Sequence, residues 1–298
     1  MNFEETLTKR VNDIENILHQ YLPVEEGYAK TVIEAMNYSV LAGGKRLRPM
    51  LMQEAYRLFD GNGEEIEPFM AAIEMIHTYS LVHDDLPCMD NDEYRRGRKT
   101  THAVYGEGMA VLAGDALLNY AFETACKAFD YTNNPLRVGK ALQILGNKSG
   151  IYGMIGGQTA DIEAEDFPQE KISRELLLYI HENKTAALIQ NALMIGAVLA
   201  GANEDEINIM EKIGYNVGIA FQIQDDILDI TGTMEELGKP IGSDEKNHKV
   251  TYVTLNGLEK SHQDVESLSK DAVGMLQSIR GNHEYLEQLL LQLIGRNK

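Results

Sequence analysis

Apolar residues recur every three or four positions along most of the chain, which is the period of an amphipathic helix. The first such segment ends near Pro23, because proline cannot continue a helix, and a longer apolar segment, residues 70–81, ends near Pro87. Further helical patterns cover residues 107–129, 135–156, 173–183, 204–231 and 283–295. Since no alternating run with hairpin turns stands out, the pattern predicts one all-α domain, residues 1–298, of about ten or more helices.

Four polar, glycine-containing segments interrupt this pattern. They are residues 43–49, 90–101, 157–170 and 232–249. Long connections in a compact helical protein tend to carry function, and three of these four also contain clustered lysine or arginine. We therefore expect functional residues in them, and we expect the segment 238–249 to close over a bound substrate as a lid does.

The stretch 185–202 is apolar enough to suggest a membrane span. Gln190 and Asn191 lie near its middle among many small residues, so a helix buried on all sides is the better interpretation. The sequence thus predicts no stable membrane insertion.

Charge and cysteine content narrow the class further. The chain has 27 lysines and arginines against 46 aspartates and glutamates, a formal net charge of −19, which argues against a general nucleic-acid surface. Cys88 and Cys126 cannot form a disulfide framework, which suits a reducing compartment. The N-terminal segment is acidic and amphipathic, unlike a secretory signal. These features favour a cytoplasmic protein.

Two aspartate clusters end two of the apolar segments. They consist of Asp84, Asp85 and Asp90, and of Asp225, Asp226 and Asp229. Asp225 and Asp229 are four residues apart and project from one helix face about 6 Å apart, whereas Pro87 leaves Asp90 to be positioned by a turn. Because Mg²⁺ prefers one or two carboxylates together with water and substrate phosphates, both clusters are candidate magnesium sites. A solvated acidic helix end is the alternative, but two related clusters argue against it.

The basic residues lie next to glycines or next to the first aspartate cluster. In residues 43–49, GGKRLRP, glycine allows close backbone approach and lysine and arginine bind phosphate, although the frame is not that of a Walker A loop. Residues 95–99, RRGRK, follow the first cluster directly and fit the cationic half of a metal–diphosphate site. Lys184, Lys239 and Lys249 stand alone, and each could equally be an ordinary surface lysine. No serine or cysteine has the surroundings of a nucleophile.

Taken together, these residues resemble the trans-isoprenyl diphosphate synthases, and most closely the bacterial farnesyl diphosphate synthases. The resemblance covers residues 29–257, with GGKRLRP, the first Asp-rich segment and RRG, GGQxxD, HENKT, FQxQDDxxD and KxTY in family order. It implies the all-α isoprenoid synthase fold, a single polyprenyl synthetase domain with helices around a deep central cavity. It also implies a homodimer.

The resemblance also implies two diphosphate sites. Three Mg²⁺ ions held by Asp84, Asp85, Asp90 and Asp225 would bind the allylic diphosphate, with Asp226 and Asp229 as further metal ligands. The allylic diphosphate site would be completed by Arg95, Lys184, Gln222, Lys239 and Lys249. Isopentenyl diphosphate would bind at Gly44, Lys45, Arg48, His77 and Arg96.

The implied reaction ionises the allylic C–O bond, and the double bond of isopentenyl diphosphate attacks the resulting carbocation. Lys184, Thr185 and Gln222 would stabilise that cation. The departing diphosphate, rather than a protein base, would accept the proton that is then lost.

Chain length depends on the side chains below the first cluster. Tyr79 lies about 7.5 Å deeper than Asp84 along a helix, with Ser80 one turn below Asp84, and a bulky ring there favours farnesyl diphosphate as product. The segment LPCMDND also resembles geranylgeranyl diphosphate synthases, which keeps a twenty-carbon product as the alternative.

Other classes remain open at this point. An HD-type metal-dependent phosphohydrolase would use His83 and Asp84, but it would not need the second aspartate cluster or GGKRLRP. A terpene cyclase normally lacks two matched clusters. A catalytically silent subunit would be expected to have lost motif residues, and none is missing.

Overall fold

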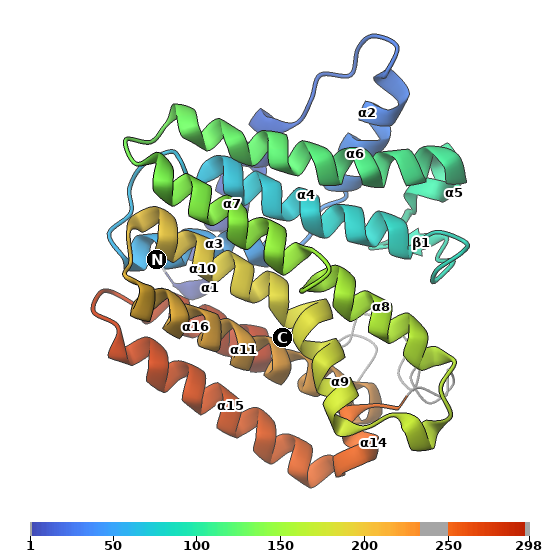
Figure 1. Cartoon of the computed structure of the whole chain (residues 1–298), viewed down its shortest axis with the longest axis vertical. Coiled ribbons are helices and arrows are strands. Elements are labelled where there is room, and N and C mark those ends of the chain that lie inside the picture. The colour runs from blue at the N-terminus through green and yellow to red at the C-terminus, as the bar shows by residue number, and fades with distance from the viewer. Residues whose placement is uncertain (1, 233–249, 296–298) are drawn as a thin grey trace. The chain divides into compact units, whose positions relative to one another are not determined.

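The structure is a computed structural model that describes residues 2–232 and 250–295. The chain divides into two compact units, Met1–Gln53 with Asn62–Leu142 and Glu54–Gly61 with Gln143–Lys298. It passes from the first unit to the second within α3 (Leu47–Leu58), returns after Gly61, and enters the second unit again within α7 (Pro135–Ser149). Helices build both units, so the all-α prediction is confirmed (Figure 1).

The first unit is organised around α4 (Glu67–Asp84), which packs along α6 (Glu107–Cys126). Most side chains of α4 are buried, which explains why its sequence is apolar on nearly every face. α2 (Lys30–Val40) contacts both α4 and α6, and α1 (Phe3–Tyr21) packs against α4. The smaller elements of this unit are β1 (Tyr94–Arg95), β2 (Arg98–Lys99), α5 (Thr101–Tyr105) and η1 (Lys127–Asp130).

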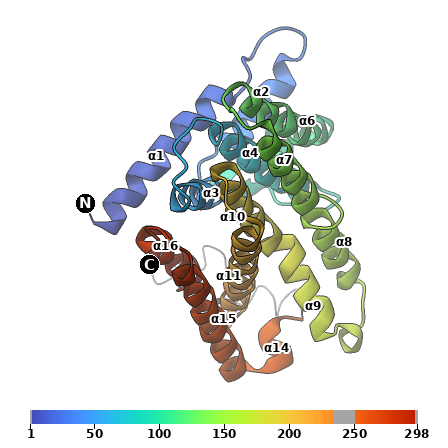
Figure 2. The same ribbon diagram turned by 60° about the vertical axis from the view of Figure 1, so that its left-hand side comes forward.

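The second unit is organised around the long helix α11 (Glu204–Thr231). Packed against it are α10 (Ala187–Ala200), α15 (Leu258–Ser278) and α16 (Glu284–Gly295) (Figure 2). The remaining elements of this unit are α8 (Met154–Glu165), η2 (Gln169–Lys171), α9 (Arg174–Ile180), the π-helix η3 (His181–Ala186) and α14 (Tyr252–Asn256). Within this unit α8 and α9 pack on η3, which in turn packs on α11.

Most of the stretch that suggested a membrane span forms α10, and the side chains of residues 187–199 are buried, as the buried-helix interpretation predicted. Gln190 is 3% exposed and accepts a hydrogen bond from the Lys148 Nζ at 2.9 Å. Asn191 is fully buried. Over residues 2–232 and 250–295, no helix has the length and apolar character needed to cross a bilayer.

Several expectations about the interruptions are wrong. Residues 157–165 continue α8 and are not a connection, and the preceding helix α7 ends at Ser149 rather than near residue 156. The segment 90–101 contains an antiparallel hairpin in which Arg95 pairs with Arg98. Its turn residues Arg96 and Gly97 have φ angles of 52° and 74°, as a two-residue type I′ turn requires. Strands of two residues leave no alternation for a sequence pattern to detect.

Candidate functional site

The first aspartate cluster lies at the C-terminal end of α4. Asp84 is the last helical residue and Asp85 is the C-cap. The chain then turns back, and the Asp90 N–H donates a hydrogen bond to the Asp84 carbonyl oxygen at 2.8 Å. As predicted, a turn rather than helical phase positions Asp90. Asp85 is buried and Asp90 is exposed.

Arg95 reaches this cluster from the hairpin. Its Nε and Nη2 both lie 2.7 Å from the Asp85 Oδ1. Burial raises the pKa of the Asp85 carboxyl above its usual value, although Arg95 opposes that shift. Arg95 therefore already places a positive charge next to the Asp85 carboxylate. A bound metal ion would share that carboxylate with Arg95.

The loop before α3 is held by Arg46, which sequence reasoning did not single out. Arg46 has a side chain that is 1% exposed and a left-handed φ of 48°. It donates hydrogen bonds of 2.7 Å to the Glu15 carboxylate, the Glu74 carboxylate and the Val40 carbonyl oxygen. A glutamate inside the apolar stretch of α4 is the signal that could have indicated this network, because a buried carboxylate needs a partner.

Positive charge concentrates around His77 on α4. Burial, followed by the charges of Arg48 and Arg96, holds the pKa of His77 well below its usual value, so the imidazole is neutral at pH 7. Burial and neighbouring arginines also lower the pKa of Arg48 and of Arg96. The Arg48 Nε is buried and has no hydrogen-bond partner within the described residues. An anion would relieve this repulsion, so the cluster fits the phosphate group predicted here.

Gly44 allows Arg96 to approach this loop. The Arg96 guanidinium donates a hydrogen bond to the Gly43 carbonyl oxygen. A Cβ on Gly44 would lie 2.6 Å from the Arg96 Nη1, and the φ of Gly44 is 147°. The glycine is therefore required by its backbone conformation and by the close approach of the guanidinium. Lys45, the other predicted residue of the loop, is exposed.

The hairpin that carries Arg95 and Arg96 is anchored on α2. The Tyr38 hydroxyl donates a hydrogen bond to the Lys99 carbonyl oxygen at 2.7 Å. The Arg98 guanidinium lies over the Tyr38 ring, 4.4 Å from its centroid. Tyr38 thus contacts Arg98 and Lys99 of the hairpin, although the residues next to Tyr38 in the sequence do not indicate this role.

The second unit contains a pocket of about 170 Å³ that gathers residues from several helices. Its lining residues are Asp161, Leu177, Ile180, His181, Lys184, Thr185, Gln222, Asp225, Asp226, Val250 and Thr251. The pocket therefore brings together Lys184, Thr185 and Gln222, the three residues that the resemblance places at the carbocation. The Thr185 hydroxyl donates a hydrogen bond to the Gln222 Oε1 at 3.1 Å.

Lys184 lies in this pocket and pairs with Asp161, its Nζ 2.5 Å from the Asp161 Oδ2. Asp161 is the aspartate of the GGQxxD segment and is 6% exposed, yet sequence reasoning assigned it no role. The backbone around Lys184 is a π-helix, a form that is frequent at functional sites.

Two glycines allow that π-helix to pack closely against α8 and α11. A Cβ on Gly157 of α8 would lie 2.1 Å from the Lys184 N, and one on Gly218 of α11 would lie 2.2 Å from the Ala186 Cβ.

The second aspartate cluster occupies the last two turns of α11. Asp226 is 5% exposed, and its Oδ2 accepts a hydrogen bond from the Tyr252 N–H at 2.7 Å. Asp229 is 3% exposed, whereas Asp225 is half-buried and lines the pocket. Of the three carboxylates, Asp225 is the most accessible to a ligand.

The carboxylates suit Mg²⁺ only if a ligand completes the coordination. Within residues 2–232 and 250–295, no three His, Cys, Asp or Glu side chains come together as a closed metal site. Mg²⁺ is held instead by one or two carboxylates with waters and phosphate oxygens, and it prefers hard oxygen ligands. Asp84 and Asp85 in the first unit and Asp225 in the second supply such oxygens, so the donor sets fit Mg²⁺ bound together with a diphosphate.

The residues proposed to limit chain length lie on α4 within the first unit. Tyr79 is 5% exposed, and burial followed by the charge of Asp84 raises the pKa of its phenol to about 12. Its ring packs edge-on against His83, with centroids 5.9 Å apart. The Ser80 hydroxyl donates a hydrogen bond to the His77 carbonyl oxygen at 2.9 Å. The Nε2 of His83 lies 3.1 Å from the Val111 carbonyl oxygen and 3.8 Å from the Asp115 Oδ1.

The remaining predicted residues, Lys239 and Lys249, lie outside the described residues, as does the expected lid at 238–249.

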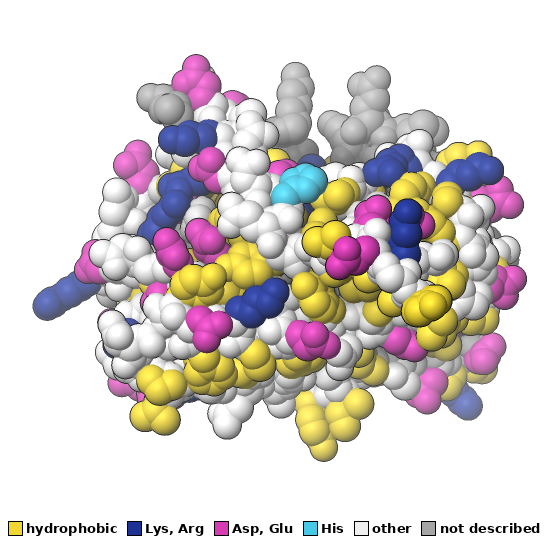
Figure 3. Space-filling model, turned by 90° about the horizontal axis from the view of Figure 1, so that it is seen from above, with side chains coloured by type: hydrophobic (Ala, Val, Ile, Leu, Met, Phe, Trp, Pro, Cys, Tyr) yellow, Lys and Arg dark blue, Asp and Glu magenta, His cyan; other side chains and the backbone are white. Residues whose placement is uncertain are grey.

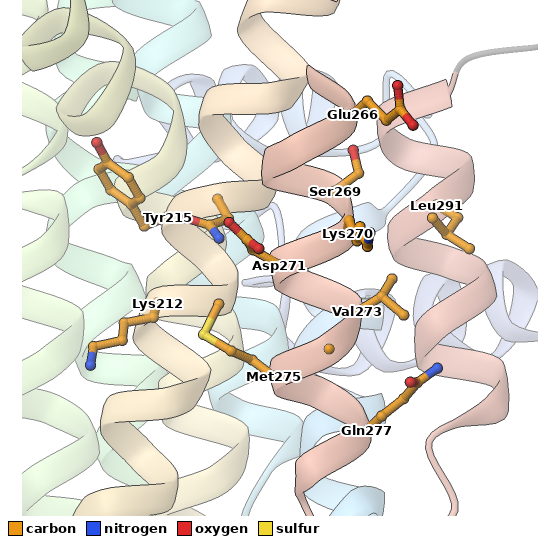
Figure 4. A pocket seen from close by; sticks show the side chains of 12 residues that line it. Lys212, Tyr215, Glu266, Ser269, Lys270, Asp271, Val273, Met275, Gln277 and Leu291 are labelled. Carbon is orange, nitrogen blue, oxygen red and sulfur yellow. The ribbon is translucent and has the colours of Figure 1, made fainter. Parts of the chain in front are cut away.

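A wider groove of about 1050 Å³ runs between α11, α15 and α16 (Figure 4). Lys212 and Tyr215 line it from α11, and Leu291 lines it from α16. The groove contains no predicted site residue, so its size alone does not make it the functional site.

Comparisons with known proteins identify the family of the chain. The polyprenyl synthetase family profile matches residues 29–288. The chain is 46% identical over 240 residues to a heterodimeric geranylgeranyl pyrophosphate synthase large subunit of Arabidopsis thaliana, covering 80% of this chain and 65% of that protein.

The chain is 40% identical to a farnesyl diphosphate synthase of Micrococcus luteus over 95% of this chain and 94% of that protein. The structure of Helicobacter pylori geranyltransferase, complexed with magnesium and isoprenyl diphosphate, superimposes with a TM-score of 0.82 at 33% identity, covering 99% of this chain and 97% of that one. The chain therefore belongs to the polyprenyl synthetase family of prenyltransferases.

Proposed function

We propose that the protein condenses isopentenyl diphosphate with dimethylallyl or geranyl diphosphate to give farnesyl diphosphate and diphosphate. One observation carries the proposal: a single pocket holds Lys184, Thr185 and Gln222 next to the half-buried carboxylate of Asp225. A cation, two polar dipoles and a metal-binding carboxylate form the set that ionisation of an allylic diphosphate requires.

Mg²⁺ is the proposed cofactor, with three ions when substrate is bound. Support comes from the carboxylates described above and from the magnesium in the Helicobacter pylori complex. When bound, Mg²⁺ would neutralise charge on the leaving diphosphate. Its proposed ligands are Asp84, Asp85, Asp90 and Asp225. Asp226 and Asp229 are further candidates, and the Asp226 Oδ2 already accepts the Tyr252 N–H.

The chain's own residues would bind and orient the two substrates. Lys184 lies 2.5 Å from Asp161, and it would turn from this carboxylate to the more negative diphosphate. Thr185 and Gln222 would direct their oxygens at the allylic cation. Leu177, Ile180 and other apolar lining residues would keep out water, which would otherwise capture that cation.

Isopentenyl diphosphate is proposed to bind the cationic cluster of the first unit. Arg48 and Arg96 would each donate to its phosphates, which are the partner that the buried Arg48 Nε lacks among the described residues. His77 would bind as a neutral imidazole, because its pKa is held low.

A fifteen-carbon product is favoured by the buried ring of Tyr79, five positions before Asp84 on α4. The relatives include both farnesyl and geranylgeranyl synthases, so a twenty-carbon product is the second candidate. Replacing Tyr79 by Ala should shift the product towards longer chains, as measured by chromatography of the dephosphorylated prenols. An unchanged product distribution would mean that Tyr79 belongs only to the core.

We also propose a homodimeric, cytoplasmic protein. Val111 and Leu112 on α6 are 41% and 54% exposed, and a second copy could cover them. Figure 3 shows hydrophobic side chains reaching the surface among charged ones on one face of the molecule. Sedimentation analysis would test the dimer.

The activity itself is tested by product analysis. The protein is incubated with Mg²⁺, isopentenyl diphosphate and dimethylallyl or geranyl diphosphate, and the prenyl products and released phosphates are identified. Elongated prenyl diphosphates would support the synthase. Cyclic hydrocarbons would indicate a cyclase instead, and free phosphate without elongation would indicate a hydrolase.

A further inference from the structure

Tyr252 joins three elements of the second unit through one buried phenol. The residue is 2% exposed and is the first residue of α14. Its hydroxyl donates a hydrogen bond to the Asp264 Oδ2 of α15 at 2.8 Å and accepts one from the Arg174 Nη2 of α9 at 3.0 Å. Asp264 is itself held by the Lys260 Nζ at 2.5 Å. A neutral hydroxyl thus lies between a cation and an anion, which fixes both of its hydrogen bonds.

The backbone of Tyr252 reaches the candidate site from the same position. Its N–H donates a hydrogen bond to the Asp226 Oδ2 at 2.7 Å, and Asp226 is 5% exposed. The preceding residues, Val250 and Thr251, line the pocket. Thr251 also caps α14, since its side chain accepts a hydrogen bond from the Thr254 N–H.

Arg174 connects the hydroxyl to α9, which lines the pocket through Leu177 and Ile180. It begins α9, whose last residue, Ile180, leads directly into the π-helix that carries Lys184 and Thr185. Its guanidinium also lies over the Tyr252 ring, 5.7 Å from the centroid. Through its hydroxyl Tyr252 contacts the helix that leads to Lys184, and through its N–H it holds the end of α11.

We infer that Tyr252 is a positioning residue that sets the spacing between the two walls of the pocket, with Arg174 and Asp264 acting through its hydroxyl. Tyr252, Arg174 and Asp264 do not line the pocket. Their effect on the reaction is therefore an effect on geometry, and small displacements of reacting groups are costly in catalysis. The expected effect on catalysis rests on the proposed function. The expected coupling between α9, α14 and α15 does not.

The experiment uses the full chain with Tyr252→Phe, which removes the hydroxyl and keeps the ring. Hydrogen exchange is measured on the ligand-free protein in peptides from 174–186 and 251–256, where we expect exchange to rise by about tenfold. Steady-state kinetics should show kcat lowered by about tenfold, with KM for either substrate changed by less than about twofold. Tyr28→Phe is the control, because Tyr28 is fully exposed in the loop before α2, and it should change neither readout.

Two further variants guard against a simple folding defect. Arg174→Ala removes one bond from the exposed side of the network, and it should reproduce the exchange and kcat changes. Arg174→Lys keeps a cationic donor and should restore part of both. Because the three residues act as a unit, the double variant Arg174→Ala/Tyr252→Phe should be no worse than the more severe single variant.

Three outcomes would overturn the inference. They are unchanged exchange and kcat in Tyr252→Phe, additive losses in the double variant, and a rise in exchange across the whole second unit with no rescue by Arg174→Lys. Failure of the proposed function would look different, because the wild-type protein would form no prenyl product while the exchange measurements still tested the coupling.

Discussion

The two aspartate clusters share a sequence pattern, but the fold satisfies them in different ways. In the first, the buried Asp85 is bound by the side chain of Arg95, which extends from a two-stranded hairpin. In the second, the buried Asp226 is bound by the backbone N–H of Tyr252. A side-chain partner can move away when a ligand binds, whereas a backbone N–H is fixed by its helix. Under the proposed function, the first cluster would therefore exchange partners when a ligand binds, and the second would stay in place with Asp225 lining the pocket.

The largest expected effect distinguishes two adjacent carboxylates of the second cluster. Asp225→Asn should lower kcat/KM by about 10²- to 10³-fold, because it removes a charge that is available to the metal and diphosphate. Asp226→Asn should cost much less, since an amide oxygen can still accept the Tyr252 N–H. Steady-state kinetics would measure both. Equal losses would show that the two carboxylates share one role, and Asp205→Asn, at an exposed position in the first turn of the same helix, is the conservative control.

A second prediction tests how closely the pocket of the second unit is packed. Gly157→Ala would place a Cβ 2.1 Å from the Lys184 backbone nitrogen, so it should lower the free energy of unfolding by about 1–3 kcal/mol. Gly274→Ala is the matched control on α15, because nothing lies within 4 Å of its Cβ position. That control should be neutral or stabilising by up to about 1 kcal/mol. Denaturant titration would measure both, and a tolerated Gly157→Ala would contradict the close packing.

A third prediction concerns the cationic cluster of the first unit. The folded protein holds the pKa of His77 below its usual value of about 6.5, so the unfolded chain binds the proton more readily. The free energy of unfolding should therefore fall as the pH drops below about 6.5, by at most about 1.4 kcal/mol per pH unit from this group.

His77→Gln should remove this part of the pH dependence. The measurement is the difference in unfolding free energy between wild type and variant from pH 7 to pH 5. Added inorganic diphosphate should raise the pKa of His77 and reduce the difference. Parallel pH profiles for the two proteins would contradict the assignment.

The smallest expected effect concerns the hairpin anchor. Tyr38→Phe removes the hydrogen bond to the Lys99 carbonyl oxygen but keeps the ring beneath Arg98, at a cost of about 1 kcal/mol. It should raise KM for isopentenyl diphosphate about fivefold and leave KM for the allylic substrate unchanged. Tyr94→Phe in the same hairpin, where Tyr94 is 60% exposed, is the control. A similar effect of both variants would exclude a specific anchor.

Local patterns predicted the features that depend on neighbouring residues. The helices, the buried nature of α10 and the place of both aspartate clusters at helix ends follow from hydrophobic spacing and from Pro87. The β1–β2 hairpin was not predicted from the sequence, because its two-residue strands are too short to show an alternating pattern. Its turn could have been read from Arg96-Gly97 only by considering backbone conformation.

The supporting contacts could not be predicted, because their partners lie far apart in the sequence. Asp161 lies 23 positions from Lys184, and Glu74 lies 28 positions from Arg46. Tyr252 belongs to the same KxTY motif as Lys249, yet its hydroxyl partner Arg174 is 78 positions away. Composition and local spacing carry no information about such pairs, because the fold determines which distant residues come into contact.

The proposed condensation is tested most directly by following diphosphate release from geranyl diphosphate with and without isopentenyl diphosphate in the presence of Mg²⁺. We predict that release depends on isopentenyl diphosphate and that one diphosphate appears for each farnesyl diphosphate formed. Release of diphosphate or phosphate without a new carbon–carbon bond would contradict the proposed function.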